Sequence, residues 1–148
     1  MRVHSLSRLR ERAGVRATSA IIRPVNEPRA TEIKLRRKSR LLEVNFESGE
    51  RFQLSFEYLR VYSPSAEVQG HGRGQEVLQF GKENVQVNAI EPIGHYAVRL
   101  MFDDGHNTGL YTWKYLFELG TEYAAKWQHY LDRLAQYGYE RKVNPIPS

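Results

Sequence analysis

Apolar and polar residues alternate along two neighbouring stretches after residue 32. The apolar positions are Ile33, Leu35, Leu42, Val44 and Phe46. A period of two is typical of strands with one buried face, so the two stretches predict a hairpin with its turn at 37–40. Alternation resumes at 52–54 after a turn at 47–50, where a glycine accepts a positive φ. The apolar spacing over 56–62 then predicts a short helix.

The same order of features recurs 56 residues later. Strands are predicted over 85–93 and 97–102, and a turn at 103–105 leads into Leu110. Adding 56 to the residue number places Val44 on Leu100, Phe46 on Phe102, Gly49 on Gly105 and Leu54 on Leu110. After one inserted residue, Phe56, Tyr58 and Leu59 fall on Trp113, Tyr115 and Leu116. An ancient duplication and a chance recurrence of the pattern both explain this match.

The C-terminal third is predicted to be helical. Thr112 is a good N-cap for a helix that runs toward Leu119, and the pair at 120–121 is predicted to end that helix and cap the next. Apolar residues at helical spacing then continue to Gly138, and we expect this stripe to form core contacts. The predicted fold class is α+β, with a mainly antiparallel sheet built from two hairpin-plus-helix units and covered by the C-terminal helical segment.

Charge divides the chain unevenly. Its 148 residues carry a net charge of +5, but residues 1–40 hold twelve Arg or Lys and three Glu, a net +9. All aromatic residues lie between Phe46 and Tyr139, so the first thirty residues have nothing large enough to anchor a core. We therefore expect a basic flexible arm over 1–30, one domain over 31–139 and a flexible tail over 140–148.

The basic arm has three interpretations. It is a solvated tail, a targeting segment rich in Arg and Ser, or an electrostatic contact for nucleic-acid phosphates. The first is favoured over targeting. Because the arm has no aromatic residue to stack on bases, nucleic acid is a weaker candidate partner than protein.

Composition excludes several kinds of chemistry. The chain has no cysteine, which removes disulfides, thiolate metal ligands, cysteine nucleophiles and cysteine-ligated iron–sulphur clusters. No apolar run approaches the roughly 20 residues that cross a bilayer, and no secretory signal is evident. We expect a soluble cytoplasmic protein with no membrane partner.

Two polar segments are candidate sites. The irregular stretch 63–82 contains a possible strand at Val77–Phe80 and a glycine-rich part around His71, but it lacks the phosphate-loop and dinucleotide patterns. The turn at 103–107 offers two carboxylates and His106. With His71, Glu67 or His95 this turn would supply nitrogen and oxygen ligands for a hard metal, although a simple Asp-Gly turn is the favoured interpretation. No serine-nucleophile elbow is present, which argues against a hydrolase.

Two motifs carry a family resemblance. They are Leu59-Arg60-Val61-Tyr62-Ser63-Pro64-Ser65-Ala66-Glu67-Val68-Gln69-Gly70-His71-Gly72 and Phe102-Asp103-Asp104-Gly105-His106-Asn107-Thr108-Gly109-Leu110-Tyr111-Thr112-Trp113. Over about residues 31–125 the chain resembles the stand-alone bacterial form of the domain found at the N-terminus of gamma-butyrobetaine hydroxylases. In those hydroxylases the domain binds a structural zinc through three cysteines and one histidine.

The resemblance also implies what this chain lacks. The cysteine positions fall on Ser63, Ser65 and Val68, and the histidine position falls on His106. Hydroxyls and a valine do not replace thiolates, so we expect neither zinc nor another cofactor, with His71 and His106 as the only candidate metal ligands. The iron and 2-oxoglutarate chemistry of the hydroxylases belongs to a separate, larger domain. We therefore expect no enzyme activity and no catalytic residue.

The resemblance extends to a domain appended to some Mrp-type carriers of iron–sulphur clusters. It favours a non-catalytic accessory module that docks onto a protein partner in iron–sulphur or related cofactor metabolism. The candidate binding surface is Arg60, Tyr62, Ser63, Ser65, Glu67, His71, Asp104, His106, Tyr111 and Trp113. The alternatives are a metal- or small-ligand-binding protein that uses His71 and His106, and nucleic-acid association through the basic arm.

Overall fold

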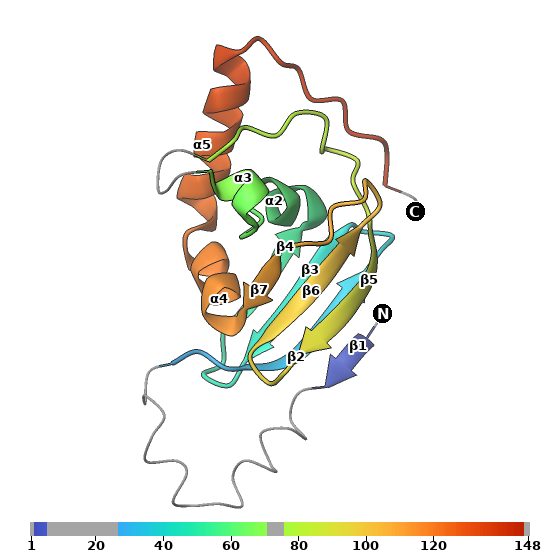
Figure 1. Cartoon of the computed structure of the whole chain (residues 1–148), viewed down its shortest axis with the longest axis vertical. Coiled ribbons are helices and arrows are strands. Elements are labelled where there is room, and N and C mark those ends of the chain that lie inside the picture. Colours follow the sequence, from blue (N-terminus) through green and yellow to red (C-terminus); the bar gives the residue numbers. More distant parts are fainter. Residues whose placement is uncertain (1, 6–26, 71–75, 147–148) are drawn as a thin grey trace, which may run out of the picture.

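The first predicted hairpin belongs to a four-stranded antiparallel sheet in the part of the chain that the structure describes. The computed structural model describes residues 2–5, 27–70 and 76–146 (Figure 1). The strands β1 (Arg2–Ser5), β2 (Ala30–Arg36), β3 (Leu41–Phe46) and β4 (Arg51–Ser55) are neighbours in that order. Val44 lies opposite Ile33 and Phe52, so the apolar positions share one face as alternation predicts.

The expected basic arm is described only in part. Within residues 1–30, Arg2–Ser5 form β1, which pairs with β2 at the edge of the sheet. Residues 6–26 lie outside the described residues. The arm and the domain boundary near residue 30 therefore stay predictions.

A second antiparallel sheet repeats the arrangement. It consists of β5 (Val87–Ile93), β6 (Ala97–Phe102) and β7 (Leu110–Thr112), with β6 in the centre. The central strands β3 and β6 are 56 residues apart at both ends, and the turns that follow them contain Gly49 at φ 106° and Gly105 at φ 87°. Glycine accepts this left-handed region at little cost, whereas a side chain is strained there.

One pair of the repeat is wrong. Leu54 is 1% exposed, but its proposed counterpart Leu110 is 36% exposed. Buried Tyr111 takes the equivalent position, because the inserted residue comes before β7 and not after it. From there the offset is 57 residues, and it brings the helix caps Ser55 and Thr112 into correspondence.

The two sheets bury their inner faces against each other, and Figure 1 shows β6 lying over β3. The buried aliphatic and aromatic residues of both sheets form one hydrophobic cluster. Helix α4 (Trp113–Thr121) closes one end, where the Phe117 ring packs 5.1 Å from the Phe46 ring. Gly120 lies so close to the Phe52 ring that a Cβ there would be 2.4 Å from it.

The C-terminal helix α5 (Tyr123–Gln136) packs against α2 (Phe56–Val61), whose six residues are all buried. The Tyr58 ring lies 5.0 Å from the Tyr123 ring, and the Tyr58 hydroxyl donates to the Leu119 carbonyl at 2.7 Å. The α+β class, the two hairpin-plus-helix units and the C-terminal helical segment are confirmed. Among the described helices, none has the length and apolar character needed to cross a membrane.

Two local predictions are wrong. The pair at 120–121 does not separate the helices, because α4 continues through Thr121 and the Thr121 hydroxyl donates to the Glu118 carbonyl. The N-cap of α5 is Glu122, whose side chain makes no cap hydrogen bond. The predicted strand at Val77–Phe80 is absent, since this segment belongs to neither sheet; the Val77 amide instead donates to the Val68 carbonyl at 2.7 Å.

The segment after α5, predicted to be a flexible tail, is attached to the domain through residue 145. Arg141 donates from Nε to the Glu57 carboxylate at 2.8 Å, and the Lys142 amide donates to Glu83 at 3.0 Å. Arg40 donates to the carbonyls of Asn144 and Pro145. This segment therefore connects α2 and the first hairpin with the residues that precede β5.

Candidate functional site

The two motifs of the family resemblance meet at His106. This histidine follows the 103–105 turn and is 7% exposed. Its Nε2 lies 2.8 Å from the Ser63 hydroxyl and 3.4 Å from the Ser65 hydroxyl. The Ser65 amide donates to the Ser63 hydroxyl at 3.3 Å. The structure thus brings Ser63, Ser65 and His106 together, although they are more than forty residues apart in sequence.

The other side of the imidazole faces the short helix α3 (Ala66–Gln69). The Glu67 carboxylate is 3.7 Å from His106 Nδ1 and accepts from the Thr108 hydroxyl at 3.3 Å. Burial lowers the pKa of His106, and the Arg60 charge lowers it further, against the opposing effect of Glu67 and Asp104. The neutral imidazole is therefore favoured at neutral pH, and its Nε2 is able to donate to or accept from the serine hydroxyls according to the tautomer.

Asp104 connects the turn to α2. Its Oδ2 accepts from Arg60 Nε at 2.9 Å and from Lys82 Nζ at 2.6 Å, while its Oδ1 accepts from the His106 amide at 3.1 Å. Burial opposes ionisation of Asp104, but the hydrogen bonds from Lys82, His106 and Arg60 outweigh it and lower the pKa to about 2. The carboxylate is ionised at neutral pH and fixes the turn against the helix.

The residues at the zinc positions do not fit zinc. Ligand atoms in a tetrahedral zinc site lie roughly 3.3–3.8 Å apart, given bonds of about 2.0–2.3 Å. The 2.8 Å separation of Ser63 Oγ and His106 Nε2 is instead that of a direct hydrogen bond. Val68 is 2% exposed and brings no donor atom. Within residues 27–70 and 76–146, no group of three His, Asp or Glu side chains is arranged to hold a metal ion.

His71, together with the glycines around it, lies outside the described residues. The metal or small-ligand alternative that pairs His71 with His106 therefore stays a prediction. The same holds for nucleic-acid association through residues 6–26.

Several members of the predicted surface are interior residues. Tyr111 is 0% exposed and its hydroxyl donates to the Leu59 carbonyl at 2.6 Å, while Trp113 is 6% exposed and donates to the His95 carbonyl at 2.8 Å. Burial raises the pKa of Tyr111, which keeps its hydroxyl protonated as a donor. Both side chains are occupied by the core, so neither contributes to a binding surface.

Three more residues of the predicted surface are buried, namely Arg60, Ser63 and Ser65. Among the described residues of that surface, only Glu67 and Asp104 are exposed to solvent. Tyr62 belongs to a different location. Its hydroxyl donates to the Lys126 carbonyl of α5 at 2.7 Å, and burial raises its pKa to about 12. It lines a small notch between α2, α5 and the extended segment 76–80.

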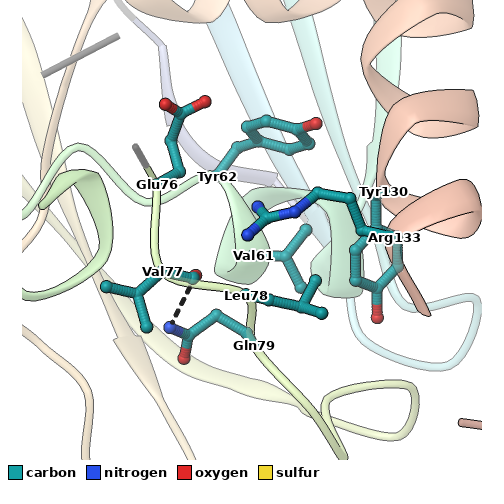
Figure 2. A pocket seen from close by; sticks show the side chains of 8 residues that line it. All are labelled: Val61, Tyr62, Glu76, Val77, Leu78, Gln79, Tyr130 and Arg133. Atoms are coloured by element: carbon teal, nitrogen blue, oxygen red, sulfur yellow. Dashed lines mark hydrogen bonds between the residues drawn. The ribbon is translucent and has the colours of Figure 1, made fainter. Parts of the chain in front are cut away.

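Figure 2 shows this notch, which is lined by Val61, Tyr62, Glu76, Val77, Leu78, Gln79, Tyr130 and Arg133. Its free space is about 10 Å³, close to that of one water molecule. Next to it the Phe80 ring contacts the Tyr137 ring at 5.9 Å, although these side chains are 43% and 69% exposed. The notch, Phe80 and Tyr137 together form one partly exposed surface.

The sequence patterns did not predict this surface. Tyr137 is the C-cap of α5 and comes four residues after Arg133, which places both on the same side of the helix as Tyr130. That spacing is a usable signal. The contribution of segment 76–80 has no such signal, because this segment meets α5 only in the folded chain.

Comparison with known proteins places this geometry in a family. The family model described as gamma-butyrobetaine hydroxylase-like, N-terminal, matches residues 33–117. One NMR solution structure is 49% identical in sequence to this chain, with a TM-score of 0.70. The match covers 86% of this chain and 96% of the chain in the NMR structure. A second NMR structure is 45% identical over 80% of this chain and 93% of that chain, with a TM-score of 0.67.

A third match is the crystal structure of a DUF971 family protein of unknown function from Acidithiobacillus ferrooxidans. Its sequence is 42% identical, the match covers 62% of this chain and 92% of the crystallised chain, and the TM-score is 0.53. A search of curated proteins finds no match. The resemblance carried by the two motifs is thus confirmed over more than half of the chain. The chain belongs to the gamma-butyrobetaine hydroxylase-like N-terminal domain family.

Proposed function

We propose that this chain is a non-catalytic module that docks onto a protein partner through the notch together with Phe80 and Tyr137, which we name the docking face. The observation that carries the proposal is the exposed aromatic pair of Phe80 and Tyr137 beside the notch. Val77, which is 49% exposed, extends the apolar surface along the same segment. Aromatic residues and arginine are enriched at protein interfaces, and their burial there supplies much of the binding energy.

The buried histidine cluster supports this face and does not itself contact the partner. Ser63 and Ser65 bond to His106, which fixes the chain at the start of α3. The Val68 carbonyl of α3 then accepts from the Val77 amide. The hydroxyl and imidazole groups that stand at the family's zinc positions therefore act on segment 76–80 indirectly, because they fix α3 and α3 in turn bonds to Val77. A fixed surface loses less conformational freedom when it binds.

Site-specific photo-crosslinking in the native host tests the proposal. A benzophenone amino acid at position 137 is expected to give a discrete protein adduct, and Phe80→Ser is expected to reduce its yield. The matched control places the same group at Tyr96, which is 54% exposed in the turn between β5 and β6. Absence of an adduct at 137, or the same adducts at both positions, contradicts docking at this face.

The identity of the adduct tests a finer part of the proposal. The family resemblance suggests a partner in iron–sulphur or related cofactor metabolism. Mass spectrometry of the crosslinked protein is expected to identify such a partner. A partner of another kind would refute this assignment and leave the docking function standing.

A further inference from the structure

The notch contains a cation, Arg133, that pairs with no anion in the described part of the chain. The Arg133 guanidinium makes no hydrogen bond or ion pair among the described residues, although the notch covers part of its side chain. Figure 2 shows it extending across the notch between the Tyr62 ring and Val61, toward the segment of Glu76 and Val77. An arginine fork in such surroundings is well placed to bind a planar acceptor such as a carboxylate.

From these contacts we infer that the docking face recognises an acidic side chain of the partner, with an apolar or aromatic side chain next to it. Arg133 binds the carboxylate, and the neighbouring side chain packs on the Phe80 and Tyr137 rings. This inference rests on the proposed docking function and specifies the chemistry of the partner. The space of about 10 Å³ beside Arg133 is too small for a metabolite, so the acidic group has to approach from outside as part of a larger surface.

The internal carboxylate of the notch does not take this role. Glu76 forms no ion pair within 4 Å with Arg133, and its Oε2 is buried without a hydrogen-bond partner in the described structure. In Figure 2 its carboxylate points away from the guanidinium. Glu76 repels an incoming carboxylate, which places the contact on the side of Arg133 that faces away from Glu76.

The position of Arg133 on α5 links the two parts of the inferred contact. Tyr137 lies one helical turn further along, and Phe80 contacts it from segment 76–80. Two neighbouring side chains of one flexible peptide, one acidic and one apolar, therefore reach the guanidinium and the ring pair together. The charge sets the position of the peptide, and apolar burial adds affinity.

Two capped dipeptides test this chemistry. Acetyl-glutamyl-phenylalanine amide carries the side-chain carboxylate, and acetyl-glutaminyl-phenylalanine amide has the same shape without the charge. Amide chemical shifts of the folded chain at low ionic strength are expected to give an affinity about fivefold higher for the glutamyl peptide, with shifts centred on residues 76–80 and 130–137. Arg133→Gln is expected to remove the difference, and Glu76→Gln to enlarge it.

The control variant is Arg99→Gln, because Arg99 is an exposed arginine of β6 whose partner is Glu91. It is expected to retain the preference for the glutamyl peptide. Equal affinities of the two peptides for the unmodified chain, or a preference that survives Arg133→Gln, overturn the inference. Crosslinking at position 137 is a separate readout, so an adduct that forms equally well in the Arg133→Gln variant overturns the carboxylate contact and leaves the docking function intact.

Discussion

Replacing Arg141 by glutamine tests whether the C-terminal segment is part of the folded domain. The Glu57 carboxylate, in a residue that is 6% exposed, accepts from Arg141 Nε at 2.8 Å, from Arg141 Nη2 and from the Tyr130 hydroxyl at 2.7 Å. The Arg141 guanidinium also lies over the Trp127 ring, 5.3 Å from its centroid. In the variant the buried carboxylate keeps only the tyrosine hydroxyl as a strong donor.

The expected cost follows from the burial of the pair. Removing one member of a buried ion pair destabilises a protein by about 3–5 kcal/mol. The Arg141 side chain is 27% exposed, so water reaches part of the space it leaves and reduces the penalty. We expect a loss of about 2–4 kcal/mol in the free energy of unfolding, or about 5–12 °C in Tm for a chain of this size.

Urea unfolding followed by far-UV circular dichroism measures this loss without relying on the emission of the neighbouring Trp127. The control is Arg99→Gln, since the side chains of its ion pair are 40% and 48% exposed and should contribute less than about 1 kcal/mol. Adding Glu57→Gln to Arg141→Gln is expected to recover part of the stability, because no buried charge then remains. If Arg141→Gln and Arg99→Gln are equally stable, the segment is a loose tail and the reasoning is wrong.

Three further predictions concern other parts of the structure. Gly120→Ala is expected to lower the free energy of unfolding by about 1–3 kcal/mol in a urea titration, because the added Cβ would overlap the Phe52 ring of β4. Helix propensity alone predicts the opposite, a gain of about 1 kcal/mol. Asp104→Asn is expected to lower the free energy of unfolding at pH 6 but not near pH 2. The pKa of Asp104 is lowered from about 3.8 to about 2, so its contribution to stability is complete above pH 3.8 and is lost as the pH falls through 2. Urea unfolding at both pH values measures this. Replacing Ser63, Ser65 and Val68 together by cysteine is expected to create a zinc site with His106 that binds one zinc ion per chain. Metal analysis of untagged protein measures the bound zinc. A variant without bound zinc would refute the correspondence between these positions and the family's zinc ligands.

The regular parts of the fold follow from local pattern. Alternation predicted β2, β3 and β4 because each has one face in the core, and Thr112 was recognisable as a cap from its position before an apolar stripe. The contacts of the C-terminal segment had no such signal. Arg141 and Glu57 are 84 residues apart, and a polar sequence with two prolines is compatible with both an attached and a free segment.

The candidate site also has features that the sequence indicated and features that it could not show. The resemblance aligned Ser63, Ser65 and His106 with ligands of one zinc site in the family, and the structure brings these three side chains together. Residue type alone could not show that Tyr111 faces the core while Tyr137 faces outward, because tyrosine is amphipathic and occurs in both settings. The docking face depends on a contact between α5 and segment 76–80 that only the tertiary fold creates.

The mutual burial of the two sheets has a consequence for synthesis on the ribosome. Strands β2 to β4 end at Ser55, but the sheet that covers them is completed only at Thr112. At about 5–20 residues per second, the apolar face of the first sheet waits roughly 3–12 s for its cover. We expect a chaperone near the exit tunnel to bind the nascent chain during that interval, because the apolar face of the first sheet is then exposed.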